Sequence, residues 1–282
     1  MTRISRLLAA ALLAAGACVG AQAQTIGSSF PAGFPVIEDT SLGKPVIGFG
    51  AAGSVARTPV IFLHGNNDTP FPTACNPLGR VQAFAQYLAD RGYAPSELWA
   101  LGYQGDQCNL GADQTNRSRI AHTVAANVPD LSRFVAIDGP NHGIINCSPN
   151  PANYFQSPAA GGFTPDAEIC KELGSPDTPF LKRLNRGDDT PSPTRVLVIR
   201  NADKSFVYFP IQDGVIAPVP AEDSFGRATD FSRSASLQGA FELNLTGQGA
   251  FDPVLGTSHL GILNSPQTWA ATFDFLAGRP RR

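Results

Sequence analysis

The spacing of apolar residues in the first half of the chain predicts strands that alternate with helices. Short apolar runs that are typical of buried strands lie at residues 60–63, 97–103 and 134–137. Between the first two of these strands, residues 80–91 carry apolar side chains at helical spacing, and Gly92 follows as a helix stop. Strands joined by helices in this order are typical of crossover units in a mostly parallel sheet.

The second half of the chain continues this pattern after a long interruption. Residues 144–190 are rich in Pro, Gly and Cys and have no helical or strand period, so we expect a loop or lid over one end of the sheet. Two further strands are predicted at residues 196–200 and 241–245, and a closing helix at residues 266–276. The side chains of this helix that should face inward are Trp269, Phe273 and Leu276.

The first residues have the pattern of a secretory signal. Basic residues precede an apolar run at 7–19, and residues 21–23 read Ala-Gln-Ala, a typical cleavage site. The apolar run is too short and too rich in Ala and Gly to span a bilayer. We therefore expect residues 1–23 to be a signal that is cut near Ala23, and residues 24–282 to form a single secreted or periplasmic domain.

Composition and charge narrow the class of protein further. With 43% hydrophobic residues the chain can bury a sizeable core. Cleavage takes Arg3 and Arg6 from the 21 basic residues, so the 23 acidic residues leave a net charge of −4, which offers no basis for binding nucleic acid or anionic membranes. It also removes Cys18, and four cysteines in an exported chain predict two disulfides whose pairing the sequence leaves open. These four are Cys75, Cys108, Cys147 and Cys170.

The strand at residues 60–63 runs directly into His64-Gly65-Asn66, which is the most informative local motif of the chain. A buried strand that ends in such a turn directs a backbone N–H toward the carboxyl edge of a parallel sheet. An ester hydrolase needs its oxyanion donor at this position. We therefore assign the backbone N–H of Asn66 as the candidate oxyanion donor, with His64 and Gly65 beside it in the substrate pocket.

Later in the chain, an acidic residue and a histidine follow in the order of a catalytic acid and base. His259 lies after the last predicted strand and before the closing helix, where a general base can reach over the carboxyl edge to a nucleophile. Asp213 follows the strand at residues 196–200 and precedes His259, as does the carboxylate that orients such a base. Asp203 is the alternative acid because it lies nearer to the end of that strand.

Together, these motifs resemble exported bacterial α/β-hydrolases of the lipase and polyhydroxyalkanoate-depolymerase-like group. The residues that carry the resemblance are His64-Gly65-Asn66, residues 97–103, residues 134–143 with Gly-Pro-Asn-His-Gly, and residues 256–260. The resemblance covers roughly residues 58–276. It implies an α/β fold with a mostly parallel sheet and helices on both faces. It also implies hydrolysis of the esters of a lipid or polyester by a Ser-Asp-His triad, without a metal or cofactor.

The nucleophile is the part of this arrangement that the sequence does not supply. Members of the group carry a Gly- or Ala-His-Ser-x-Gly elbow before the strand at residues 134–137, but residues 105–133 hold no Ser with Gly two positions later. These 29 residues are also too few for the strand and the two crossovers that an elbow needs. The simplest explanation is an internal deletion near Leu131 and Ser132, which would remove a strand from the middle of the sheet.

One other residue could supply the missing nucleophile. Residues 121–125, Ala-His-Thr-Val-Ala, mimic an elbow with Thr123 as the nucleophile, but Ala125 replaces the Gly that allows tight strand-to-helix packing. We expect His142, which follows a strand, to brace its loop or line the pocket. The spacings of the four histidines fit no metal-ligand pattern. The alternative function is therefore that of a non-catalytic relative, which binds an apolar ester or polymer surface through residues 144–190.

Overall fold

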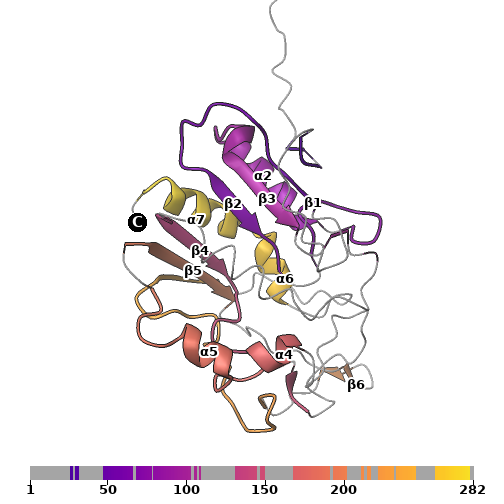
Figure 1. The fold of residues 1–282 in the computed structure, drawn as a ribbon, viewed down its shortest axis with the longest axis vertical. Coiled ribbons are helices and arrows are strands. Elements are labelled where there is room, and N and C mark those ends of the chain that lie inside the picture. The colour runs from indigo at the N-terminus through magenta and orange to yellow at the C-terminus, as the bar shows by residue number, and fades with distance from the viewer. Residues whose placement is uncertain are drawn as a thin grey trace, which may run out of the picture.

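The computed structural model combines strands and helices in the manner of an α/β protein (Figure 1). It describes residues 26–27, 29–31, 47–65, 68–77, 79–102, 105–106, 108, 131–144, 147–149, 168–190, 193–201, 211–212, 215–216, 222–231, 233–245 and 258–279. The strands are β1 (Ile47–Phe49), β2 (Val60–Leu63), β3 (Leu98–Gly102), β4 (Arg133–Ile137), β5 (Arg195–Asn201), β6 (Ile211–Gln212), β7 (Val215–Ile216) and β8 (Phe241–Leu245). The helices are α2 (Arg80–Ala89), the 3-10 turn η2 (Pro95–Glu97), α4 (Glu168–Leu173), α5 (Pro179–Leu184), α6 (Ser258–Leu263) and α7 (Pro266–Leu276).

The strands form two three-stranded sheets and one short hairpin. Sheet A has the order β1-β3-β2, in which β2 runs parallel to β3 with Phe62 opposite Ala100, and β1 is antiparallel. Sheet B has the order β4-β5-β8 and is parallel throughout, with Val198 opposite Ala136 on one side and Glu242 on the other. Strands β6 and β7 form the hairpin. The prediction of helices combined with mostly parallel strands is therefore confirmed.

The elements with the clearest apolar spacing occur where the sequence predicted them. Strands β2, β3, β4, β5 and β8 match their predicted ranges to within one residue at each end. Helix α2 begins as predicted and ends at Ala89, after which Gly92 takes a φ of 91°, a left-handed conformation that suits glycine after a helix. Helix α7 spans the predicted residues, and Trp269, Phe273 and Leu276 pack on the core of sheet A as expected.

The helices that pack on the two sheets lie on one face of them. Helix α2 packs on Phe62 of sheet A, and helices α6 and α7 pack on Leu197 of sheet B. Ile137 of β4 packs with both groups, so the two cores are continuous. On the other face of sheet B, Val198 packs near Leu237, which belongs to a loop. Within the described part of the chain these helices cover one face, and coverage of the other face by helices stays a prediction.

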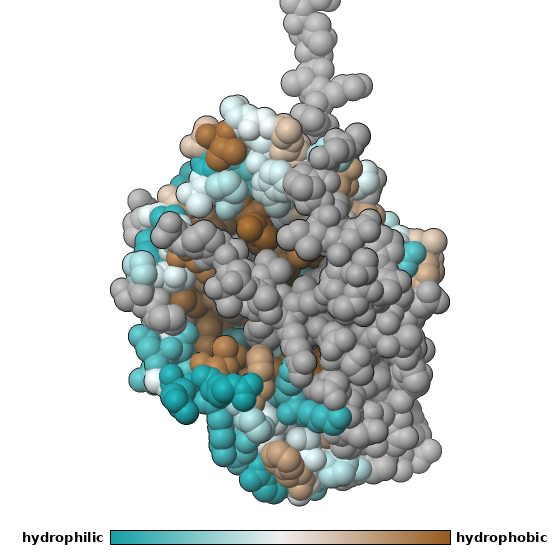
Figure 2. All heavy atoms as spheres, viewed as in Figure 1, coloured by the Kyte–Doolittle hydropathy of each residue, from teal (hydrophilic) through white to brown (hydrophobic). Residues whose placement is uncertain are grey.

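In the described residues an interruption separates sheet A, which ends at β2, from sheet B, which ends at β4. These two strands are drawn next to each other in Figure 1. In the part of the chain that the structure describes, no strand pairing joins them. In the central strand β5, Leu197, Val198 and Ile199 are 0% exposed. In β4 only Ala136 is buried, and Ile61 of β2 is 50% exposed. Figure 2 shows apolar side chains gathered in the region of β2, β4 and β5. Each of these two edges therefore lacks a neighbouring strand within the described residues.

Residues 144–190, which we expected to form a loop or lid, contain two helices and a core of their own. Helices α4 and α5 bring Leu173 and Leu181 into a buried cluster with Ile144 and with Phe231 from a later loop. Each helix has six residues, which is too few for a helical period to be recognised in the sequence. The hairpin of β6 and β7, strand β1 and helix α6 are similarly short and were not predicted.

Both predicted disulfides are present, and the structure establishes their pairing. Cys75 is bonded to Cys108, and Cys147 to Cys170. The first is exposed at the surface, and the second is buried in the cluster that holds α4 and α5. Disulfides of this kind are typical of proteins that fold in an oxidising compartment. Among the described helices, none has the length and apolar character needed to cross a membrane.

Candidate functional site

The turn after β2 holds His64 inside the protein. Its side chain is 5% exposed, and its ring Nδ1 lies 2.8 Å from the carbonyl oxygen of Gly65. Because a carbonyl oxygen can only accept, Nδ1 carries the proton of this hydrogen bond. At Gly65, an added Cβ would meet no atom within 4 Å, so the turn opens onto free space there. Asn66 lies outside the described residues.

The loop after this turn is fixed to the start of α2 by a buried ion pair. Arg80 Nη1 lies 3.5 Å from Asp68 Oδ2, and the two side chains are only 6% and 5% exposed. Asp68 Oδ1 also accepts the backbone N–H of Thr69 at 2.8 Å. Removing one partner of a buried pair leaves an uncompensated charge, so the loop is strongly held in this arrangement.

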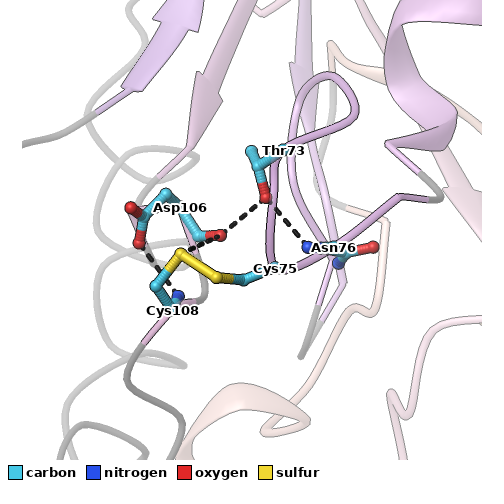
Figure 3. The surroundings of a disulfide bond; sticks show 5 residues. All are labelled: Thr73, Cys75, Asn76, Asp106 and Cys108. Atoms are coloured by element: carbon cyan, nitrogen blue, oxygen red, sulfur yellow. Dashed lines mark hydrogen bonds between the residues drawn. A yellow bond between two sulfur atoms is a disulfide. The ribbon is translucent and has the colours of Figure 1, made fainter.

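The exposed disulfide joins the loop that follows β2 to the segment that follows β3 (Figure 3). Around the Cys75–Cys108 bond, Thr73 Oγ1 donates to the carbonyl oxygen of Asp106 at 2.7 Å and accepts the N–H of Asn76 at 2.9 Å. Asp106 Oδ1 in turn accepts the N–H of Cys108 at 2.9 Å. The disulfide and these hydrogen bonds therefore tie together the segments that follow two neighbouring parallel strands, β2 and β3.

The turn after β4 is sharp and buried. Asp138 has a φ of 47°, an uncommon left-handed conformation for a residue with a side chain, and it is fully buried. Its N–H donates to the carbonyl oxygen of Ile199 at 2.7 Å, which continues the pairing of β4 with β5 by one residue. The chain then folds back so that Asn141 Nδ2 donates to the carbonyl oxygen of Ala235 at 2.8 Å. Strained residues at the end of a strand often mark functional sites.

In the same turn, both ring nitrogens of His142 have side-chain neighbours. Asn185 Nδ2 donates to the carbonyl oxygen of Asn141 at 3.0 Å, which fixes the orientation of the amide, and it also lies 3.0 Å from His142 Nδ1. Nδ1 therefore accepts, and the ring proton is on Nε2, 3.6 Å from Asp189 Oδ2. With neighbours at both nitrogens, the ring of His142 braces its own loop against the segment that follows α5, and this geometry does not present it as a general base.

The other predicted catalytic residues lie in parts of the chain that are described incompletely or not at all. His259 occupies the first turn of α6, where a loop was expected, and Ile262 on the same helix packs on sheet B. Asp213 falls between β6 and β7 and lies outside the described residues, as do Asp203 and Thr123. Figure 1 shows α6 beside the carboxyl ends of β4 and β5.

Two buried carboxylates that the sequence did not single out organise the surrounding loops. Glu97 is 1% exposed, and Asp223 is equally buried. Burial raises the pKa of each, but hydrogen bonds outweigh it, so that both pKa values lie below their ordinary range. The bonds to Glu97 come from three backbone N–H groups, and those to Asp223 come mainly from Arg227. The only sequence signal for Glu97 is its position three residues after Ala94, as in a capping box.

Comparison with known proteins adds no relative from which a function could be transferred. No protein-family model matches the chain, and no curated protein matches it significantly. Among the described residues, no three His, Cys, Asp or Glu side chains gather in a way that could hold a metal ion. The function must therefore be argued from the residues of this chain.

Proposed function

We propose that this protein is a secreted or periplasmic member of the ester-hydrolase group that its motifs resemble, with a lipid or polyester as its substrate. The observation that carries the proposal is the position of the interruption in the sheet. The resemblance requires a nucleophile strand in the middle of the sheet, after β3 and before β4 in the chain. The two edges that face each other unpaired in the described residues are those of β2 and β4. A strand between them would join sheets A and B into one.

The positions of the surrounding elements are consistent with this proposal. Strand β2 ends in the turn of His64, and α6 packs through Ile262 on the carboxyl-terminal part of β5 at Ile199. Ester hydrolysis needs an oxyanion donor and a general base at one edge of the sheet. The proposed roles are oxyanion donation by the N–H of Asn66, general base for His259, and orientation of that base by Asp213 or, alternatively, Asp203.

The same interruption favours a second candidate function, which is binding without catalysis. A triad without its nucleophile leaves only the residual effects of substrate binding and the oxyanion donor. Such a protein would bind an apolar ester or polymer surface through the unit of residues 144–190. The buried Cys147–Cys170 disulfide and the hydrophobic cluster around α4 and α5 give that unit the rigid support that a binding surface needs.

A fluorophosphonate probe together with a soluble p-nitrophenyl ester separates the two candidates. Labelling with turnover supports the hydrolase, and His259→Ala should then abolish turnover, whereas Asp274→Asn on the exposed side of α7 serves as the control and should leave it unchanged. Turnover that survives Thr123→Ala removes Thr123 from the mechanism. Absence of both labelling and turnover, with retained binding to polyester beads, supports the binding protein.

Resequencing the gene across the codons for Leu131 and Ser132 tests the proposed deletion directly. An intervening segment that encodes an apolar strand and a Ser-x-Gly elbow supports the hydrolase proposal. Continuous codons at this position show that the gene itself encodes Leu131 next to Ser132, and the catalytic proposal then depends on the labelling and turnover experiments alone.

A further inference from the structure

A tight hairpin at residues 222–228 presents an aromatic side chain to solvent, and we call it the Phe225 hairpin. Its arms are joined by an antiparallel bridge and by a 2.9 Å hydrogen bond from the N–H of Asp223 to the carbonyl oxygen of Arg227. Gly226 takes a φ of 73°, a conformation that lets the chain reverse directly after the tip. Phe225 at the tip is 58% exposed, the largest value among the exposed large apolar residues of the described chain.

A buried carboxylate fixes the conformation of this tip. Asp223 Oδ1 accepts the N–H groups of Phe225 and Arg227 at 2.9 and 3.0 Å. Asp223 Oδ2 accepts from Ser175 Oγ at 2.7 Å and from Nη2 and Nε of Arg227 at 2.7 and 3.0 Å. Hydrogen bonds to a charged acceptor are about twice as strong as neutral ones. The backbone of the tip is thus held in the conformation in which Phe225 is exposed.

The Phe225 hairpin is also joined to the unit of α4 and α5. The N–H of Ser224 donates to the carbonyl oxygen of Gly174 at 2.7 Å, immediately after α4. On the other arm, Arg227 Nη2 lies 2.9 Å from Asp177 Oδ2, just before α5. Cys170 of the buried disulfide lies in α4 itself. The Phe225 hairpin is therefore attached to a helical unit that a disulfide stabilises.

Exposed apolar residues are common, and most of them need no explanation. Phe241 is the natural comparison because it is 53% exposed. Its ring centroid lies 6.1 Å from that of Phe275, and Arg195 lies over both rings, so Phe241 is the outer edge of the core of sheet B. Phe225 instead projects from a hairpin, with the guanidinium of Arg227 4.8 Å from its ring centroid.

We propose that the Phe225 hairpin is the contact through which this protein adsorbs to the surface of a solid polyester, and this inference rests on the proposed function for its substrate class. A polyester surface presents apolar groups and ester carbonyl oxygens that accept hydrogen bonds. Phe225 supplies an aromatic surface, and the half-exposed guanidinium of Arg227 supplies N–H donors beside it. Asp177 and Asp223 balance the charge of Arg227, which suits an uncharged polymer better than an anionic membrane.

The test is adsorption of the full chain to poly(3-hydroxybutyrate) granules, measured by depletion of protein from the supernatant. Phe225→Ala should weaken adsorption about tenfold, which corresponds to about 1.4 kcal/mol. Phe225→Trp should retain adsorption, and the matched control Phe241→Ala should adsorb like the wild type. Thermal unfolding of all variants establishes that they are folded.

Three results would overturn the proposal. They are unchanged adsorption of Phe225→Ala, equal weakening by Phe225→Ala and Phe241→Ala, and binding of the wild type to phosphatidylcholine vesicles as tightly as to the granules. Turnover of a soluble p-nitrophenyl ester is measured in parallel and does not depend on the hairpin. Selective loss of adsorption in Phe225→Ala supports the surface contact even if no turnover occurs, and a wild type that does not adsorb refutes the contact whether or not turnover occurs.

Discussion

Replacing Glu97 by glutamine measures how much one buried carboxylate contributes to holding sheet A together. Glu97 Oε1 accepts the N–H groups of Ala56 and Arg57, both at 2.6 Å, and Oε2 accepts the N–H of Ala94 at 2.8 Å. The first two donors lie in the segment that leads into β2, and the third lies in the turn that leads into β3. The carboxylate therefore connects the approaches to two paired strands.

The expected loss of folding free energy in Glu97→Gln follows from the number of hydrogen-bond acceptors that glutamine provides. Its single amide oxygen can replace one carboxylate oxygen, so its NH₂ group must face at least one of the three N–H donors. A buried donor left unsatisfied costs about 1–3 kcal/mol, and the remaining bonds lose their charge assistance, so we expect about 2–4 kcal/mol in total. For a domain of this size each kcal/mol lowers Tm by about 2–4 °C, so Glu97→Gln should lower it by about 4–16 °C.

The stabilisation that Glu97 provides should decrease as the pH falls. The folded-state pKa of Glu97 lies below its reference value of 4.5, so its contribution is complete above that pH and is lost as the pH falls through the folded-state value. Thermal unfolding followed by circular dichroism at pH 7 and pH 3 should show a large Tm difference between wild type and Glu97→Gln at pH 7 and a smaller one at pH 3. Asp274→Asn, which removes an exposed ion pair with Arg279, is the control and should change Tm little. Equal Tm values at pH 7, or a difference that does not vary with pH, would refute the reasoning.

Three further predictions concern other parts of the fold. Replacing Cys147 and Cys170 together by serine opens a cross-link between residues 23 positions apart, which should cost about 3 kcal/mol in urea unfolding, and an unchanged midpoint would contradict this. Asp223→Asn should lower Tm at pH 7 and have less effect below pH 4, because the folded-state pKa of this carboxylate is also lowered; an equal loss at both pH values would argue against a charged acceptor. Trp269→Ala removes a ring stacked 5.7 Å from that of Phe84, and it should cost about 3–5 kcal/mol in guanidinium unfolding; a cost below about 1 kcal/mol would show that α7 does not hold sheet A.

The elements that could be predicted are those whose own residues show a clear apolar period. Strands β2 and β8 and helix α7 were predicted with their observed bounds because their apolar periods are uninterrupted and long enough to be recognised. Helices α4 and α5 were missed because six residues give fewer than two turns, and what stabilises them is a shared cluster with Phe231 and a disulfide. Short elements that depend on tertiary packing carry little information in their own sequence.

In the candidate site, too, some features have a local sequence signal and others depend on contacts between distant parts of the chain. The order of His64, Asp213 and His259 along the chain could be read directly, whereas the ring of His142 takes its role from Asn185 and Asp189, more than 40 positions away. No local pattern encodes such a contact. Whether a histidine braces loops or accepts a proton depends on which groups face its two nitrogens, and those groups come from other elements of the fold.

Helix α7 explains how sheets A and B remain together although no pairing joins β2 to β4 in the described residues. Trp269 packs on the core of sheet A and Phe275 on that of sheet B. Six positions in a helix correspond to about 240° of rotation, so one short helix presents a separate apolar face to each sheet. A strand inserted between β2 and β4 would pair two open edges at once and provide cover near Ile61, which is half exposed. If the proposed nucleophile strand were present between β2 and β4, it would thus contribute to the stability of the sheet as well as to catalysis.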